Sequence, residues 1–456
     1  MRTRIREALA LAVLAIVALS GAACSDLLDV KTPDTIAANT VDPVEDAATF
    51  ANSAWQNFVD SHSTMVVYTA WFTNELRVGD TFPTRNEFGR RFLDDRQNGT
   101  LSGDVWDPLA RAVASAEDAL ALLQPELGDN NVSIARLYLA SAFSTLDMAE
   151  AFCTGVVRQT ADAPASPLPE GSPELTRDQM LAHVIARFQQ AISSGTSVGT
   201  SEGTEIANAA RIGLARANLF AGNSGDVAGS LGSIPAGFEF DAVYVDDPSN
   251  RGRLGNDLHS FSSATALRES GVVGPEWRAL GAGQDISGDG TFTGEEAGDA
   301  RVTWEYDGRL AQDGVFEFVY QTSHPGWDAP LVVASELEAQ YLIQEATGTD
   351  ASRIALINQQ RTAAGQPTVT AGDFADSDAI LEELLYQKGL DFWLTGRRMP
   401  DWRWYTGDGA TTRSTHYRFI IRPTDDYYKP AVGVMGSQVC FPLPYNEYSR
   451  NPDINR

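Results

Sequence analysis

The segment DISGDGTFTGEE, residues 285–296, places oxygen-bearing side chains at the spacing of a calcium-binding loop. Gly290 stands where such a loop turns most sharply, and Phe292 supplies the apolar position near its end. Hard oxygen ligands at alternate residues suit Ca²⁺, so the segment predicts a structural calcium site, and no other cofactor is expected. The alternative is a solvated Gly/Asp hairpin. The predicted ligands are Asp285, Ser287, Asp289, Thr291, Thr293 and Glu296.

Two matches to Gly-x-Ser-x-Gly, GTSVG (195–199) and GTSEG (199–203), raise the alternative of a serine hydrolase. A nucleophile elbow needs a strand before the serine and a helix after it, whereas both matches follow a helical pattern in a Ser/Gly/Thr-rich linker. No pair of acids is singled out for glycoside cleavage. No metal-ligand spacing connects the five histidines, which are His62, His183, His259, His324 and His416.

The N-terminal segment has the pattern of a lipoprotein leader. Arginines precede an apolar run from Ala8 to Leu19, and small residues lead to Cys24. Because a bilayer-spanning helix needs about 20 apolar residues, the run predicts a cleaved leader, residues 1–23, rather than a membrane anchor. Cys24 would then be acylated, although Gly21 stands where such leaders usually have Leu. The alternative is an ordinary secreted protein in which this cysteine is a free thiol.

The composition restricts the partners of the chain. Its 456 residues carry a formal charge of −27, which becomes −29 without the leader because three Arg and one Glu are lost. Such a chain is repelled by phosphate backbones and anionic headgroups, which excludes nucleic-acid binding. Attachment to a membrane would therefore depend on covalent acyl chains. The mature chain is long enough for one large layered domain or two closely packed domains.

Two cysteines remain when Cys24 is acylated, Cys153 and Cys440. A secreted chain is exposed to an oxidising compartment, so we expect these two to form a disulfide that closes a long loop. Two separately buried thiols are the alternative. Neither cysteine has a His or a second Cys at ligand spacing, which argues against a metal or catalytic role.

The elements that must position these residues are mainly helical. Between 235 and 330, Gly, Asp, aromatic residues and short alternating runs predict loops with a few strands, as in 301–308 and 315–321. We therefore expect an N-terminal helical part (24–234), an irregular insertion (235–330), and C-terminal helices with an extended tail (331–456). Apolar residues recur every three or four positions, which predicts helices over 43–60, 104–124, 131–152, 176–194, 205–223, 334–347, 351–363 and 377–395. Their pairing by short turns is typical of tetratricopeptide-like stacking.

Three parts of the chain together resemble the SusD/RagB family of outer-membrane nutrient-binding lipoproteins. They are the leader ending CSDLLDV, the segment ASELEAQYLIQEATGTDASRIALINQQRTAAG (334–365), and LLYQKGLDFWLTGRRMPDWRWY (384–405) with the tail FPLPYNEYSRNPDI (441–454). The family motif Glu-Gly-x-Arg-x-x-Asp-Leu-x-Arg is matched except that Thr395 replaces Glu and Trp402 replaces Leu. The matching residues are Gly396, Arg398, Asp401 and Arg403, with Pro442, Pro444, Asn451 and Pro452 in the tail.

The resemblance implies a mainly α protein, a SusD-like α-α superhelix with a large irregular loop and short-strand insertion. It also implies a lipid-anchored protein on the outer membrane, facing the exterior. Such proteins capture an oligosaccharide or another nutrient oligomer for a SusC-like TonB-dependent transporter, and no motif residue is catalytic in the family. The alternatives are a secreted polymer-degrading enzyme of the glycoside hydrolase class and a membrane-tethered helical-repeat adaptor.

The side chains of the same motif predict a partly buried ion-pair cluster of Asp401 with Arg397, Arg398 and Arg403. Aromatic residues of 392–404 would pack beside this cluster. Rings outside the obvious helices could instead stack on the apolar faces of sugars while amides bind the hydroxyl groups. Each ring could also be a core residue. The candidate ligand-binding residues are Trp71, Asn74, Trp277, Trp304, Tyr306, His324 and Trp327.

Overall fold

The computed structural model describes residues 42–157, 173–278, 280, 298–406, 428–429, 431–451 and 454. Residues 43–456 belong to one unit, whose described part is mainly helical with short strands. This is the predicted fold class. Within the described residues, no helix combines the length and the apolar composition needed to cross a membrane. Cys24 and the predicted calcium loop lie outside these residues.

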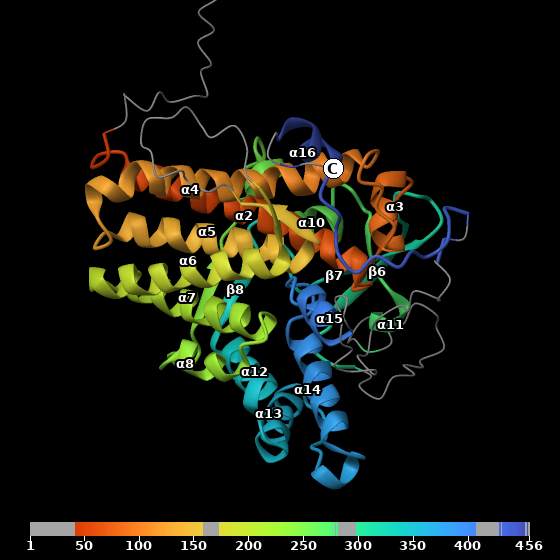
Figure 1. The fold of residues 1–456 in the computed structure, drawn as a ribbon. Coiled ribbons are helices and arrows are strands. Elements are labelled where there is room, and N and C mark those ends of the chain that lie inside the picture. Colours follow the sequence, from red (N-terminus) through yellow and green to blue (C-terminus); the bar gives the residue numbers. More distant parts are fainter. Residues whose placement is uncertain are drawn as a thin grey trace, which may run out of the picture. The chain divides into compact units, whose positions relative to one another are not determined.

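Five long helices form the N-terminal bundle and lie side by side in Figure 1. In the bundle α2 packs on α4 and α5, α5 packs on α6, and α6 packs on α7. A π-helical turn, Leu101–Trp106, leads directly into α4. The helices are α2 (Ala47–Phe72), α4 (Asp107–Leu127), α5 (Val132–Ala151), α6 (Arg177–Val198) and α7 (Ser201–Phe220).

Side-chain caps and close contacts fix the hairpin between α6 and α7. Thr176 and Gln179 form a capping box at the start of α6, and the Thr200 hydroxyl accepts a hydrogen bond from the backbone of Gly203 at the start of α7. A Cβ atom on Gly195 would lie 2.5 Å from the carbonyl oxygen of Gly203, so only glycine allows this approach. The expected linker at 195–203 is therefore wrong, because both Gly-x-Ser-x-Gly segments lie mostly within helices.

Short strands and short helices from both halves of the chain pack against this bundle. The described strands form two-stranded antiparallel pairs: β1 (Leu76–Val78) with β5 (Gly271–Val273), β2 (Thr154–Val156) with β3 (Glu174–Thr176), β4 (Glu239–Ala242) with β8 (Leu331–Ser335), and β6 (Trp304–Leu310) with β7 (Glu317–Gln321). Short helices lie between them. These are α3 (Pro83–Arg90), α8 (Val227–Leu231), α9 (Arg251–Leu254), α10 (Asp257–Phe261) and α11 (Pro275–Arg278).

The C-terminal helices between residues 336 and 391 extend away from the bundle at the bottom of Figure 1, whereas the last described helix lies at the top. Tyr341, Ile357, Leu384 and Phe392 form part of a separate apolar core among them. α12 also contacts α7, and α15 contacts α2 and α5, so these helices are joined to the bundle. They are α12 (Glu336–Thr347), α13 (Asp350–Ala363), α14 (Ser377–Asp391), α15 (Arg398–Thr406) and α16 (Tyr445–Arg450).

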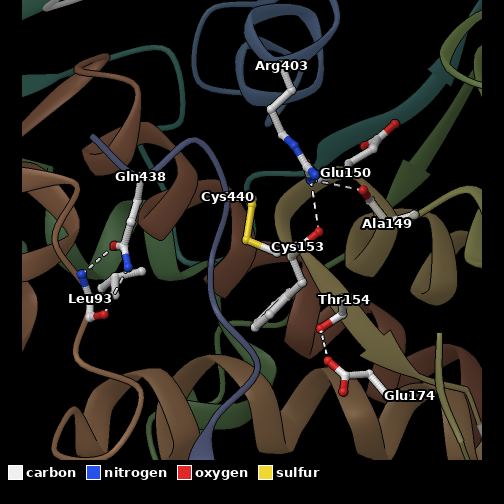
Figure 2. The surroundings of a disulfide bond; sticks show 10 residues. Leu93, Ala149, Glu150, Cys153, Thr154, Glu174, Arg403, Gln438 and Cys440 are labelled. Carbon is white, nitrogen blue, oxygen red and sulfur yellow. Dashed lines mark hydrogen bonds between the residues drawn. A yellow bond between two sulfur atoms is a disulfide. The ribbon is translucent and has the colours of Figure 1, made fainter. Parts of the chain in front are cut away.

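The C-terminal tail is fastened to the end of α5 by a disulfide between Cys153 and Cys440 (Figure 2). This is the pairing expected from the sequence. The neighbouring Phe441 exchanges backbone hydrogen bonds with Ala151 and Cys153, of 2.8 and 2.9 Å. The side-chain amide of Gln438 binds both the backbone N–H and the carbonyl of Leu93. The tail is therefore an integral part of the fold.

Candidate functional site

All four predicted ligand-binding tryptophans are core residues. At most 6% of the surface of each of these residues is exposed, so none presents a ring face to a ligand, contrary to the expectation. The indole N–H of Trp277 donates to the carbonyl of Asn74, and its ring stacks on Trp393 with a centroid distance of 5.9 Å. Large aromatic residues contribute most when they are fully desolvated, which explains this placement. The four are Trp71, Trp277, Trp304 and Trp327.

The remaining predicted ligand-binding residues are not brought together. Asn74 is buried at the end of α2, whereas Tyr306 in β6 and His324 are partly exposed. Although part of the His324 residue is exposed, burial of its imidazole lowers the pKa to about 4, so the ring is neutral at physiological pH. Within the described residues, no group of three or more His, Cys, Asp or Glu side chains could hold a metal ion.

The family-like motif contains a buried ion-pair cluster, and the cluster includes a lysine that the prediction did not name. Asp401 lies 2.8 Å from the ammonium group of Lys388, and Lys388 lies 2.7 Å from Glu345. Burial disfavours the charge of Lys388, but these two carboxylates raise the pKa of its ammonium group above the ordinary value. The lysine is therefore held charged between two acids in the core.

The motif arginines bind backbone carbonyl groups. Arg403 donates to the carbonyls of Ala149, Glu150 and Phe152 at the end of α5, at 2.7–3.1 Å (Figure 2). Arg398 donates from Nε to the carbonyl of Thr73, 3.1 Å away. The last carbonyl groups of a helix have no partner within the helix, so they need such donors when they are buried. The motif residues therefore fasten helix ends together, which is a structural role.

Two of the described histidines pair with buried acids and do not assemble a nucleophilic site. His62 pairs with Asp147 and His183 pairs with Glu117, each through an imidazole nitrogen and a carboxylate oxygen, at 2.7 and 3.2 Å. Burial would raise the pKa of Glu117, but hydrogen bonds from His183 and Arg187 and the charge of the arginine lower it to about 2. Both acids sit inside the helical bundle, where a polymer cannot reach them.

A patch around α10 combines exposed and buried groups, both apolar and hydrogen-bonding. We call it the α10 patch. Phe82 is 51% exposed, and the Arg85 guanidinium lies 4.7 Å from its ring centroid. The buried ring of Phe261 lies between two guanidinium groups, those of Arg85 and Arg268, at 5.2 and 4.5 Å. The α10 patch consists of Phe82, Arg85, Asp104, Asp257, Phe261 and Arg268.

Carboxylates supply the acceptors of the α10 patch. The hydroxyl of Tyr68 donates to the exposed Asp104, 3.3 Å away, and the hydroxyl of Thr64 donates to Asp257, 2.6 Å away. Burial raises the pKa of Asp257. Burial and the nearby charge of Asp257 also raise the pKa of Asp60 to about 6. Perturbed carboxyl groups of this kind cluster at functional sites.

This arrangement can bind a ligand that is rich in hydroxyl groups. Arg268 offers exposed donors, Asp104 offers exposed acceptors, and Phe82 offers an exposed apolar face, whereas Arg85 is already paired with Asp80. Sequence reasoning missed the patch because its residues come from α3, α10, the loops beside these helices and the π-helical turn before α4. The local signal was Phe82 immediately before a helix that begins with proline, with an arginine three positions later.

The sequence matches no protein-family model and no curated protein sequence. Its structure is similar to that of surface glycan-binding protein A from Bacteroides uniformis, with a TM-score of 0.64 and 12% identity over 90% of this chain and 98% of that chain. A laminarin-binding SusD-like protein gives a TM-score of 0.63 and 12% identity over 89% and 97%. A SusD superfamily protein from Bacteroides vulgatus gives 0.60 and 14% over 91% and 98%. The fold is thus that of the SusD/RagB family, as the sequence segments predicted.

Proposed function

We propose that the chain is a surface-exposed outer-membrane lipoprotein that captures an oligosaccharide and delivers it to a SusC-like TonB-dependent transporter. The observation that carries this proposal is the match of about nine tenths of the chain to SusD-like structures, two of which are described as binding glycans. The protein acts by binding, without catalysis. Acylation of Cys24 anchors it, and the α10 patch receives the ligand.

Calorimetric titration with laminarin and a panel of other neutral glycans tests the binding function. Phe82→Ala removes the exposed ring of the α10 patch and should weaken binding at least tenfold, equivalent to about 1.4 kcal/mol. Phe92→Ala is the matched control, because Phe92 is equally exposed (54%) and also stacked by an arginine, Arg90, but lies outside the patch. Equal losses in the two variants would remove the site assignment, and no binding across the panel would remove the glycan proposal.

A turnover assay distinguishes capture from hydrolysis. Incubation of the purified protein with the glycan that it binds should release no shorter products. Asp60 and Asp257 are the acids to examine if products appear, because their pKa values are raised. Hydrolysis that disappears in Asp257→Asn would replace the binding function with an enzymatic one.

Two experiments in cells test the anchor and the partner. Metabolic labelling with a palmitate analogue should label the wild-type protein and leave Cys24→Ser unlabelled. Unlabelled wild-type protein released into the medium would contradict the anchored location. Mild detergent extraction should co-purify a large β-barrel protein, and its absence from stable extracts would contradict the transporter partnership.

A further inference from the structure

A small cavity lies between α2, α5 and the start of α15. Its volume is about 20 Å³, and its polar lining comes from His62, Thr69, Asp147, Glu150 and Arg397. A cavity of roughly 10–15 Å³, measured in this way, is large enough for one water molecule. A water is retained there only when several polar groups bind it, so the bonding of these side chains decides whether the cavity is hydrated.

His62 contributes one unsatisfied nitrogen to the cavity. Its Nδ1 atom lies 2.7 Å from a carboxylate oxygen of Asp147, and both side chains are buried. Because Asp147 is a hydrogen-bond acceptor, Nδ1 carries the proton, and Nε2 of the neutral ring is left as an acceptor. Among the described residues, no side chain or backbone group bonds to Nε2.

Glu150 contributes the second unsatisfied atom. It lies one turn after Asp147 on α5, so the two carboxyl groups lie on the same face of the helix. Its Oε1 atom has no hydrogen-bond partner among the described residues, and the nearest cation, Nη1 of Arg216, is 3.7 Å away. A buried carboxyl oxygen without a partner is costly, which favours a bound water or a protonated acid.

We propose that this cavity holds one water molecule that joins Nε2 of His62 to the Glu150 carboxyl group, so that the two side chains share a single proton. The Glu150 O–H donates to the water, and the water donates to Nε2, whose ring donates through Nδ1 to Asp147. Transfer along this chain moves the proton from Glu150 to His62 and creates a carboxylate and an imidazolium. No group outside the chain is needed.

The charges around the cavity favour one shared proton. Arg216 and Arg397 both bind Glu338, through contacts of 2.7 and 3.2 Å, so these two cations are offset by Glu338 and Asp147. The cluster is then neutral when His62 and Glu150 hold one proton between them, on either side chain. A second proton or the loss of the first leaves a net charge in a low-dielectric interior. Burial accordingly raises the pKa of Glu150 to about 7, although Arg216 opposes the rise.

The hydrated chain also joins two parts of the fold. His62 and Glu150 belong to the N-terminal bundle. Arg397 immediately precedes α15, and Glu338 lies in the first turn of α12. The water would therefore lie where the C-terminal helices meet the bundle. α15 contacts both α2 and α5 directly. A water retained in the cavity would help to fix the orientation of α15 against these two helices.

Nitrogen-15 NMR of the histidine rings tests the shared proton. The Nε2 signal of His62, assigned by its loss in His62→Gln, should shift as Glu150 titrates near pH 7, and Glu150→Gln should abolish this transition. Glu75→Gln is the matched control, because burial also raises the pKa of Glu75 to about 7 but its side chain lies outside the cavity lining. A His62 transition that is absent in the wild type, or that survives in Glu150→Gln, would overturn the proposal.

Two further measurements keep the proposal testable if a variant does not fold. A high-resolution crystal structure of the wild type should show a water between His62 and Glu150, and direct contact or a dry cavity would contradict it. Because the pKa of Glu150 is raised on folding, its contribution to stability is present below about pH 4.5 and is lost as the pH rises through 7. The melting temperature of Glu150→Gln relative to that of the wild type should therefore rise between pH 5 and pH 8. A difference in melting temperature that does not change with pH would contradict the raised pKa of Glu150.

Discussion

Lys388 binds two buried acids at the point where α14 and α15 meet. Its ammonium group lies 2.7 Å from Glu345 and 2.8 Å from Asp401, and no more than 3% of any of these side chains is exposed. Removing one partner of a buried ion pair leaves the other charge without compensation. We expect Lys388→Met to lower the free energy of unfolding by about 3–5 kcal/mol, measured by urea denaturation.

The control for this prediction is an exposed cation with as many acidic partners. Arg309 pairs with Glu269 and Asp307, and all three side chains are more than 30% exposed. Solvent screens such pairs, so Arg309→Ala should cost less than about 1 kcal/mol. Similar losses of unfolding free energy in the two variants would show that burial does not determine how much the Lys388 cluster contributes to stability.

The same distinction between buried and exposed side chains limited the prediction of the candidate site. The sequence identified which residues are aromatic, but Trp277 is buried because it packs on Trp393, which is more than 100 residues away. Phe82 is exposed because it precedes a short helix at the edge of the fold. The contacts that separate these cases are long-range, so composition and spacing could not distinguish a core ring from a surface ring.

At the scale of elements, the contact between α6 and α7 depends on a glycine. A Cβ atom on Gly213 of α7 would overlap the ring of Phe188 in α6. Forcing an extra methyl group into a packed interface typically costs about 1–3 kcal/mol. We therefore expect Gly213→Ala to lower the melting temperature and the urea midpoint, with a loss of stability in this range.

Gly389 provides the matching control because it lies inside α14, and a Cβ atom there would meet nothing within 4 Å. Alanine is a better helix former than glycine, so Gly389→Ala should raise stability by about 0.5–1 kcal/mol. The opposite signs of the two expected stability changes distinguish the effect of packing from that of helix propensity. A stabilising Gly213→Ala would mean that α6 and α7 are less closely packed than the structure indicates.

Helices and strands differed in how well the sequence predicted them. The predicted helix over 131–152 corresponds to α5 (Val132–Ala151), because its period and its Asn131 cap are local features. The predicted helix over 43–60 continues to Phe72 as α2, whose last turns are buried on nearly all sides and so lose the amphipathic period. β8 was missed because its partner β4 lies about 90 residues earlier, and local periodicity does not indicate a pairing over such a distance.

At the scale of the whole molecule, the Cys153–Cys440 disulfide closes a loop of 287 residues. The cysteine count predicted the pairing, but only the structure shows that it fixes the tail against α5, where the ring of Phe441 packs edge-on against those of Phe72, Phe88 and Phe152. Cross-linking residues so distant in sequence restricts the unfolded chain, which stabilises the fold by about 2–5 kcal/mol in most proteins.

The double variant Cys153→Ser/Cys440→Ser should therefore fold, because the aromatic contacts and hydrogen bonds of Phe441 remain, but with a free energy of unfolding about 2–5 kcal/mol lower. Urea denaturation at pH 7 measures the loss. Wild-type protein unfolded in the presence of dithiothreitol should give the same lower value, whereas the reductant should leave the variant unchanged. Equal stability of oxidised wild type and variant would mean that packing alone holds the tail, and that the cross-link adds nothing to the fold that positions the α10 patch.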